Sequence, residues 1–416
     1  MVLVVYLAAL AFSFATQVNG RTRFGPFLGA DFGAFYDAGS IYNSYPHHKI
    51  YDRDLHSKFY QNMFPDAPAD SGLPYVNAPF FVLLFPLLAR LPYKWAYLSW
   101  LLISAGLFVA ALRLLWPVLG SIPRNAWSTS LAVALSFMPF LVECLGGGQT
   151  TAFGFFFLAL ALRLDMSDRQ FESGLALALC SYKPTLLLLI FPMLIMTRRP
   201  RILLGLIAGC AFLALLSFIT VGWQGCVDYV KVLLHFTNQS TSAVSGLRSW
   251  KYVDINSFFR LLTGGHTIVR WVMTLGSAAI ILLFLVRTWW IAGRDNKSDR
   301  ALVWAITITW TLVLNIYLGI YDSSLIVLSA LLTTDILYRR ADAHGPALTT
   351  TYRNLLLLLY VVPWFTEIVA QLTGIQLYTL VLAAFGIYQI KLRIRSLHPK
   401  AAYGDNPSVD HAQNIS

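Results

Sequence analysis

Two carboxylates with aromatic and glycine neighbours follow directly after the first apolar stretch of the chain. Asp31 and Asp37 stand in a run that also holds Tyr36. A carboxylate in such a place has the right chemistry to accept a proton from an attacking hydroxyl group. Asp31 can equally satisfy the free N–H groups at the start of a helix, where short polar residues are preferred. Tyr36 and Asp37 are candidate substrate-binding residues, and Asp37 can instead support or cap the segment.

A single lysine interrupts a long apolar stretch further along the chain. Lys183 could hold a phosphate group as a point charge, or it could reach from a helix end to the membrane interface. The proline that follows it cannot continue a helix. We therefore expect two short helices, 174–182 and 184–196, with Lys183 at the tip between them. This tip would face the same side as Asp31 and make Lys183 its opposite partner across the site.

Five further polar residues at the ends of apolar segments are expected on that side and are candidates for substrate binding. Gln149 follows three glycines and either contacts a substrate or belongs to a simple turn. Asp322 either binds sugar hydroxyls or caps a helix. Arg248 and Lys251 either bind a phosphate or make general contacts with lipid headgroups. The fifth candidate is Asn77.

The composition is that of a protein with several membrane spans. Of its 416 residues 57% are hydrophobic and 12% charged, and the mean hydropathy is +0.61. The net charge of +11 is gathered in short clusters at the ends of apolar runs, for example Arg198–Arg201. Such clusters mark cytoplasmic helix ends. This arrangement argues against binding of nucleic acid.

The histidines and cysteines do not form a recognisable metal motif. His47, His48 and His56 come without a HExxH pattern or a regular carboxylate partner, and the four cysteines lack metal-ligand spacing. We expect the cysteines to be small packing residues. Neither a metal nor another cofactor is expected.

We predict an all-α helical membrane bundle of about 12 spans, because a span needs roughly 20 apolar residues. Residues 1–396 would form one domain whose first apolar segment is a retained span rather than a signal peptide. Two large extracytoplasmic loops are expected at 21–94, where an interface helix would lie near its end, and at 222–267. Residues 397–416 are expected to be a disordered cytoplasmic tail.

Taken in order, several short motifs resemble those of glycosyltransferase family 87, the polyprenol-phosphate-mannose-dependent alpha-mannosyltransferases of the C-type membrane glycosyltransferases. The motifs are Asp31–Ala38, Ile50-Tyr51-Asp52, Tyr75–Pro79, Leu84–Pro92, Gly148-Gln149, Gly174 leading to Lys183-Pro184, and Tyr321-Asp322. The resemblance implies a C-type fold with Asp31 as the catalytic base. Lys183 and the loop from Arg248 to Asn256 would bind the phosphate of the donor. The family has a more polar sequence where this chain reads Leu318-Gly-Ile320, which leaves the acceptor open.

The resemblance predicts transfer of a hexose, with mannose favoured, from a polyprenyl-phosphate donor to a lipid-linked or envelope glycan acceptor. The reaction would invert the anomeric carbon on the periplasmic or extracellular face of a bacterial inner membrane. The partners would be the donor, the acceptor and membrane lipids. Charges at membrane depth and broken helices also suit a lipid or sugar transporter or flippase, and a scaffold in an envelope-synthesis complex is a third possibility.

Overall fold

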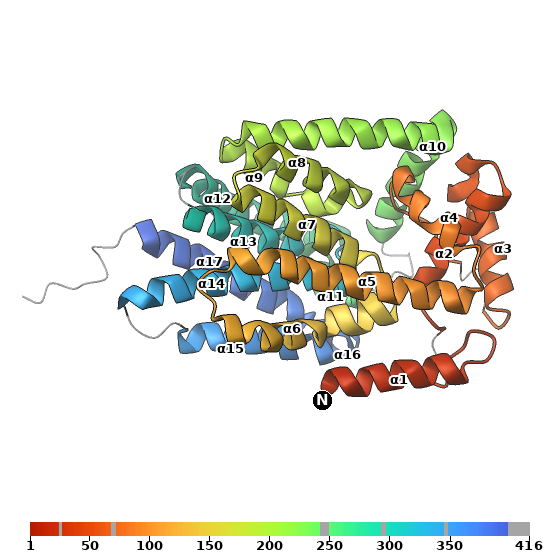
Figure 1. Ribbon diagram of the computed structural model, residues 1–416, viewed down its shortest axis with the longest axis horizontal. Coiled ribbons are helices and arrows are strands. Elements are labelled where there is room, and N and C mark those ends of the chain that lie inside the picture. Colours follow the sequence, from red (N-terminus) through yellow and green to blue (C-terminus); the bar gives the residue numbers. More distant parts are fainter. Residues whose placement is uncertain (25–26, 68–71, 242–248, 293–296, 345–347, 398–416) are drawn as a thin grey trace, which may run out of the picture.

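The structure, a computed structural model, describes residues 1–24, 27–67, 72–241, 249–292, 297–344 and 348–397. Within these residues the regular elements are all helical, and extended pairing is limited to three isolated bridges. The all-α prediction is therefore confirmed. The predicted tail, 397–416, lies outside the described residues except for its first residue, Leu397, which ends the last helix. Figure 1 shows long helices running along one axis, with shorter helices gathered at one end.

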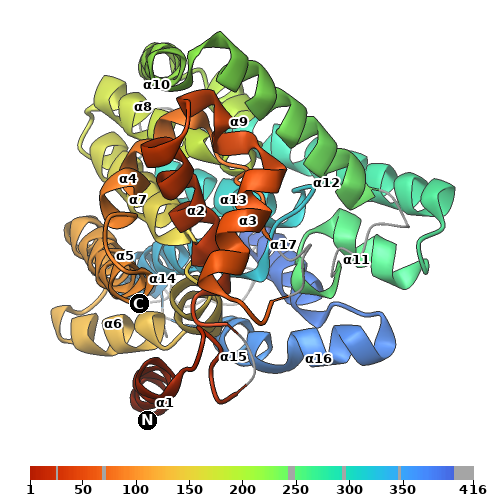
Figure 2. The same ribbon diagram turned by 90° about the vertical axis from the view of Figure 1, so that its right-hand side faces the viewer.

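The first fifth of the chain includes a cap over that end, which we call the α2–α3 end. Figure 2, which looks onto it, shows α2 and α3 in front of the bundle. The segment expected as an interface helix is a short 3₁₀ turn, Pro79–Leu84, that runs into α4. The helices of this part are α1 (Val2–Thr16), α2 (Ala30–Ser44), α3 (Arg53–Met63) and α4 (Phe85–Leu88).

The middle of the chain contains the helices that the cap rests on, together with a π-helix, Pro139–Gly146. The long stretch around Lys183 is broken there into two short helices, because Pro184 cannot continue the backbone ladder. The helices are α5 (Tyr93–Leu115), α6 (Trp127–Leu135), α7 (Thr151–Met166), α8 (Gln170–Leu179) and α9 (Ile190–Met196).

The next helix, α10 (Pro200–Thr241), changes direction at Gly222, where φ is 70° and ψ is 179°. In Figure 1 its first part runs along the top of the bundle and its second part turns down over the α2–α3 end. A left-handed φ is readily adopted only by glycine. The glycine thus divides α10 into two parts at the first residue of the predicted second loop, 222–267.

The C-terminal part completes the bundle. In Figure 1, α14 and α17 end far from α2 and α3. The helices are α11 (Ile255–Leu262), α12 (Thr267–Ile291), α13 (Lys297–Val313), α14 (Ile326–His344), α15 (Thr350–Val361), α16 (Pro363–Thr373) and α17 (Leu377–Leu397).

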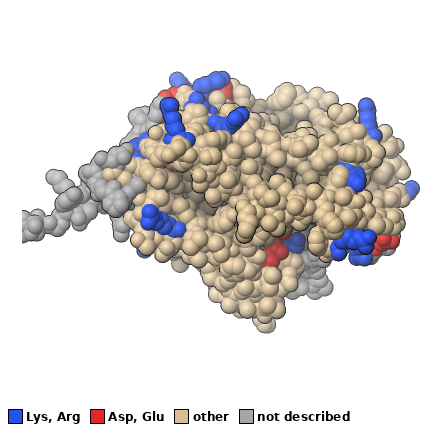
Figure 3. All heavy atoms as spheres, turned by 60° about the horizontal axis from the view of Figure 1, so that its bottom comes forward, with Lys and Arg blue, Asp and Glu red and all other residues tan. Residues whose placement is uncertain are grey.

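Five of the described helices are long and apolar enough to cross a membrane, and the number rises to seven if each of two bent pairs is one span. The expected 12 spans therefore stay a prediction. Four other apolar helices are only 10–17 residues long, and α1 is one of them with 15 residues. A run of that length falls short of the roughly 20 residues that a perpendicular span needs. Figure 3 shows a broad band with few charged side chains between the two ends of the molecule.

An aromatic cluster fixes α2 to the bundle. Phe32, which is fully buried, stacks on Trp100 of α5 with ring centroids 5.7 Å apart. Trp100 in turn stacks on Phe153 of α7 at 5.1 Å. Each such pair adds about 0.5–1.5 kcal/mol to the burial of its apolar area. The cluster therefore holds the start of α2, where Asp31 lies, at a defined position over α5 and α7.

The opposite end is held by buried charges. Asp165 of α7 is fully buried and accepts hydrogen bonds from Arg199 at 2.6 and 2.7 Å and from the indole of Trp304 at 2.8 Å. Asp168 pairs with Arg300 at 2.6 Å. These contacts join α7, the start of α10 and α13 at the end far from Asp31.

Candidate active site

Asp31 lies in the first turn of α2, and its side chain does not cap the helix. The residue at the N-cap is Gly29, with φ 58° and no side-chain hydrogen bond. The Asp31 carboxylate instead accepts a hydrogen bond of 2.7 Å from the side-chain amide of Gln149. Its backbone N–H donates to the carbonyl of Gly147 at 3.1 Å. The structure thus brings two of the predicted residues, Asp31 and Gln149, together, and the role of Asp31 as a base stays a prediction.

The turn Gly146–Gln149 that meets Asp31 is held from the side of α5. The hydroxyl of Tyr97 donates to the first carbonyl of the turn at 2.8 Å, and the indole of Trp100 donates to the carbonyl of Gly148 at 3.0 Å. Gly148 has φ 81°, and a Cβ there would lie 2.6 Å from the Cβ of Phe32. The glycines therefore let the turn approach the helix closely enough for the amide of Gln149 to reach the carboxylate.

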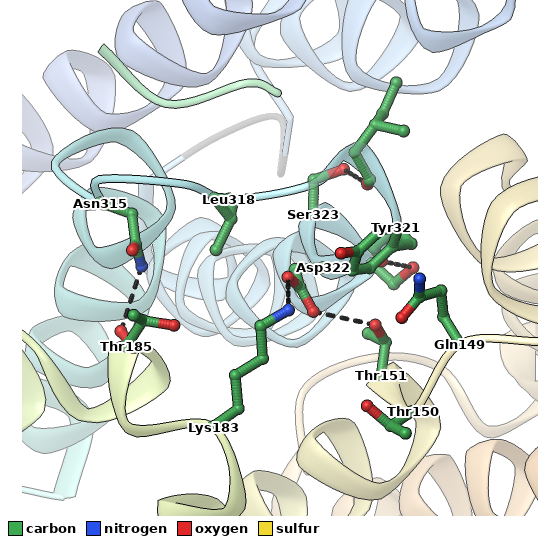
Figure 4. Close-up of polar contacts among 12 residues, drawn as sticks. Gln149, Thr150, Thr151, Lys183, Thr185, Asn315, Leu318, Tyr321, Asp322 and Ser323 are labelled. Atoms are coloured by element: carbon green, nitrogen blue, oxygen red, sulfur yellow. Dashed lines mark hydrogen bonds and ion pairs between the residues drawn. The ribbon is translucent and has the colours of Figure 1, made fainter. Parts of the chain in front are cut away.

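A second carboxylate, Asp322, is bound on both oxygens. Lys183 donates to Oδ2, and the hydroxyl of Thr151 donates to Oδ1 at 2.9 Å. Figure 4 shows Lys183 reaching from the break between α8 and α9 toward Asp322. The Lys183 side chain is 22% exposed and that of Asp322 is 1% exposed. Asp322 therefore neither caps its helix by a side-chain bond nor lies open to substrate.

One short segment connects the two carboxylates. Gln149 binds Asp31, and Thr151, two residues later, binds Asp322. The ammonium of Lys183 also lies 4.8 Å from the ring centroid of Tyr321. The predicted Asp31 and Lys183 thus belong to one neighbourhood, although the ionic partner that the structure gives Lys183 is Asp322.

Glu143 is a further candidate site residue, which the sequence analysis missed. It projects from the π-helix, its side chain is 17% exposed, and its carboxylate lies 3.8 Å from the ammonium of Lys251. π-Turns inside helices are frequent at functional sites. The available signal was a lone carboxylate in an apolar run directly before the glycine turn, since ionisable residues at membrane depth are usually functional.

The second loop is fixed to the site by Asp254, which caps α11. This fully buried carboxylate accepts hydrogen bonds from the N–H and the hydroxyl of Ser257, both at 2.9 Å, and from the N–H of Leu318 at 3.0 Å. Burial raises the pKa of Asp254 to about 7, against the opposing effect of these donors. The contacts hold the neighbouring Lys251 and Tyr252 beside the 3₁₀ segment that contains Asp322.

Three other predicted residues, Asp37, Tyr36 and Asn77, lie in the N-terminal part of the fold. Asp37 is fully buried, with no hydrogen-bond partner for its oxygens in the described part of the chain, and burial raises its pKa well above the ordinary value. It faces Nδ1 of the buried His56 at 4.0 Å, which fits the alternative that Asp37 supports the segment, and a substrate contact stays a prediction. The hydroxyl of Tyr36 donates to the carbonyl of Leu91 at 2.8 Å. The side chain of Asn77 is 7% exposed.

The remaining sequence predictions concern Arg248 and possible metal ligands. Arg248 lies outside the described residues. Within the described ranges, no group of three His, Cys, Asp or Glu side chains could hold a metal ion. All four cysteines are free, and Cys144 and Cys180 are buried.

The fold and the site place this chain among the integral membrane proteins that are built from helices. Its carboxylates, lysine and amides form a polar site at one end of the bundle. Comparison with known families gives the particular assignment. Residues 75–315 match the model of glycosyltransferase family 87, and the chain belongs to this family. It is therefore a membrane glycosyltransferase, which uses a sugar donor and a glycan acceptor. No curated protein and no solved structure matches the chain significantly.

The matched region contains only part of the site. Glu143, Gln149, Lys183 and Lys251 fall within residues 75–315, whereas Asp31 and Asp322 lie outside them. The hydrogen bond from Gln149 to Asp31 is what connects the first carboxylate to the matched region.

Proposed function

We propose that the protein transfers a hexose, with mannose as the first choice, from a polyprenyl-phosphate donor to a lipid-linked or envelope glycan acceptor. Asp31 acts as the general base, and the reaction inverts the anomeric carbon. The observation that carries this proposal is the half-buried carboxylate of Asp31, fixed by Gln149 at a glycine turn. The finer identity of donor and acceptor rests on the arguments that follow.

An apolar cleft beside the glycine turn supports a lipid-linked substrate. Its volume is about 510 Å³. Leu145, which lines the cleft, directly precedes the turn. Tyr6 of α1 also contacts the turn, since its hydroxyl would lie only 2.0 Å from a Cβ at Gly146. A long isoprenoid chain is apolar throughout, so such a wall can hold it while the phosphate stays at the polar site. The cleft is lined by Leu3, Leu7, Ala105, Gly106, Val109, Ala110, Arg113, Leu135 and Leu145.

The reaction needs one base and one stabilised leaving group. Asp31 takes the proton of the acceptor hydroxyl group. At the same time the oxygen of that hydroxyl group forms a bond to the anomeric carbon. The bond from that carbon to the phosphate oxygen breaks, and polyprenyl phosphate leaves with the electron pair. Attack opposite to the leaving group inverts the anomeric carbon, and no covalent bond to the protein forms.

Lys183 is the proposed cation on the phosphate side. Its ammonium has three N–H donors, and the structure gives it one acceptor on Asp322. With 22% of the side chain exposed, the other donors can reach the phosphate as its charge grows. Thr151 and Lys183 together hold Asp322, so the lysine stays in place without the donor.

Charge distribution supports a site on the extracytoplasmic side. Arg339 and Arg340 lie near the end of α14, and this helix, like α17, ends far from α2 and α3 in Figure 1. Basic residues gather at cytoplasmic helix ends. We therefore assign the α2–α3 end to the periplasmic or extracellular face of a bacterial inner membrane.

The test compares Asp31→Asn with wild type in lipid nanodiscs, using a short-chain polyprenyl-phosphate mannose labelled in the sugar. Loss of one general base typically lowers the rate by about 10²–10⁴-fold, and we expect a loss of this size in both sugar transfer and release of polyprenyl phosphate. Asp228→Asn is the matched control, because Asp228 forms an exposed ion pair with Lys231 on α10.

Full activity of the folded Asp31→Asn protein would refute the assignment of the base. The alternative of a transporter predicts a different result for the wild type. In that case the labelled lipid would cross the bilayer of sealed vesicles, and the sugar–phosphate bond would stay intact.

A further inference from the structure

The carboxylate of Glu143 has no part in the mechanism above, although it lies beside the catalytic aspartate. The backbone of Gly147 lies between Asp31 and Glu143 in space. A Cβ at this glycine would lie 3.4 Å from Oδ2 of Asp31 and 2.5 Å from the backbone carbonyl of Glu143. The two carboxylates also lie within electrostatic range of each other. Glu143 therefore lies near the carboxylate of Asp31, to which the proposed function brings the acceptor hydroxyl.

We propose that Glu143 and Lys251 form the subsite for the acceptor sugar and bind a hydroxyl next to the one that reacts. This inference rests on the proposed function. The ion pair that they form has a gap of 3.8 Å between the ammonium and the carboxylate oxygen. A normal N–H···O hydrogen bond is about 2.9 Å long. The two groups thus attract each other while keeping donors and acceptors for a ligand.

A sugar hydroxyl fits this pair because it both donates and accepts. It can donate to Glu143 and accept from Lys251, whose side chains are 17% and 39% exposed. Trp250, whose ring centroid lies 5.5 Å from the ammonium of Lys251, adds an aromatic face for the apolar side of a sugar ring. Hydrogen bonds to charged groups are about twice as strong as those between neutral groups.

Neighbouring charges favour a neutral polyol over a phosphate at this place. Besides Asp31, Glu367 of α16 lies within electrostatic range of Glu143 and Lys251, and its Oε1 is buried without a hydrogen-bond partner in the described part of the chain. With Glu143 near both Asp31 and Glu367, carboxyl groups outnumber the one ammonium here, which disfavours binding of an anion. The phosphate of the donor belongs on the side of Lys183, and the acceptor on the side of Glu143.

The experiment measures steady-state kinetics of purified protein in nanodiscs with labelled polyprenyl-phosphate mannose and a panel of octyl hexosides as acceptors. Glu143→Gln keeps the shape of the side chain but loses its charge, so we expect the KM for the acceptor to rise about tenfold. The KM for the donor and the hydrolysis of donor by water should stay within twofold of wild type. Glu172→Gln, at an exposed ion pair with Arg169, is the matched control.

A second variant separates binding from folding. The exchange Glu143→Lys with Lys251→Glu rebuilds an ion pair with reversed polarity beside Asp31. We expect it to recover the thermal stability of the wild type while the KM for the acceptor stays raised. If Glu143→Gln does not fold, this exchange and Lys251→Gln carry the test.

Three results would overturn the subsite. The first is an unchanged KM for the acceptor in folded variants, and the second is an equal rise in the KM for the donor. The third is full recovery of the KM for the acceptor in the exchange variant, which would show a purely structural pair. If the wild type transfers sugar neither to water nor to any acceptor, the proposed function fails and the subsite fails with it.

Discussion

Replacing Lys183 should destabilise the protein more than replacing its partner Asp322. The carboxylate is 1% exposed, and the lysine side chain is 22% exposed. Lys183→Met leaves a buried charge that keeps only the hydroxyl of Thr151. Removing one partner of a buried ion pair costs about 3–5 kcal/mol. Asp322→Asn leaves an ammonium that can turn toward water. This substitution should therefore lower the free energy of unfolding by about 1–3 kcal/mol, the cost of one unmade hydrogen bond.

The assay is reversible unfolding in mixed micelles by titration with a denaturing detergent, on Lys183→Met, Asp322→Asn and the double variant. The double variant should lose less than the sum of the two single losses, because it has no unpaired charge. Lys231→Met is the control, since this lysine is 70% exposed in its pair and should lose no more than about 1 kcal/mol. An equal or larger loss for Asp322→Asn would refute the argument from burial.

Two further changes test the glycine turn and the buried histidine. Gly147→Ala places a Cβ 2.5 Å from the carbonyl of Glu143 and 3.4 Å from Asp31. We expect the free energy of unfolding to fall by about 1–3 kcal/mol and transfer activity to be lost. Gly276→Ala, with open space around it, is the control and should change neither. His56 is 1% exposed, and burial lowers its pKa to about 4 from the ordinary 6.5. The unfolded chain therefore takes up a proton at His56 before the folded protein does, so the contribution of neutral His56 to stability is complete above pH 6.5. As the pH falls from 6.5 to 4, the free energy of unfolding should decrease by up to about 3 kcal/mol. His56→Gln should flatten this part of a pH-dependent unfolding curve, and an unchanged curve would contradict the burial argument.

Local sequence signals predicted the parts of the site that depend on the backbone alone. A proline interrupts the backbone hydrogen bonds of a helix, so Pro184 was enough to predict the position of Lys183 between two short helices. Gly148 and Gln149 after an apolar run predicted a turn. That the turn meets Asp31 is a tertiary fact, and the sequence could offer Gln149 only as one candidate among several.

Pairings between distant segments were beyond the sequence. The Lys183–Asp322 pair joins residues 139 positions apart, and no local pattern records which of several carboxylates meets the lysine. Asp37 illustrates the same limit, because a carboxylate six residues after Asp31 reads as a second site residue. The packing of α3 against α2 instead buries it against His56. The number of spans stays a prediction, because four apolar helices of 10–17 residues lie between the length of a full span and that of a surface helix.

The choice of base between the two carboxylates follows from what each must give up to take a proton. Asp322 is 1% exposed and uses both oxygens, one toward Lys183 and one toward Thr151. Protonation there would leave a lysine without its counter-ion at membrane depth. Asp31 is half-buried, and the group that binds its Oδ2 is the neutral amide of Gln149, which, unlike Lys183, needs no counter-ion. On these contacts we propose Asp31, rather than Asp322, as the base.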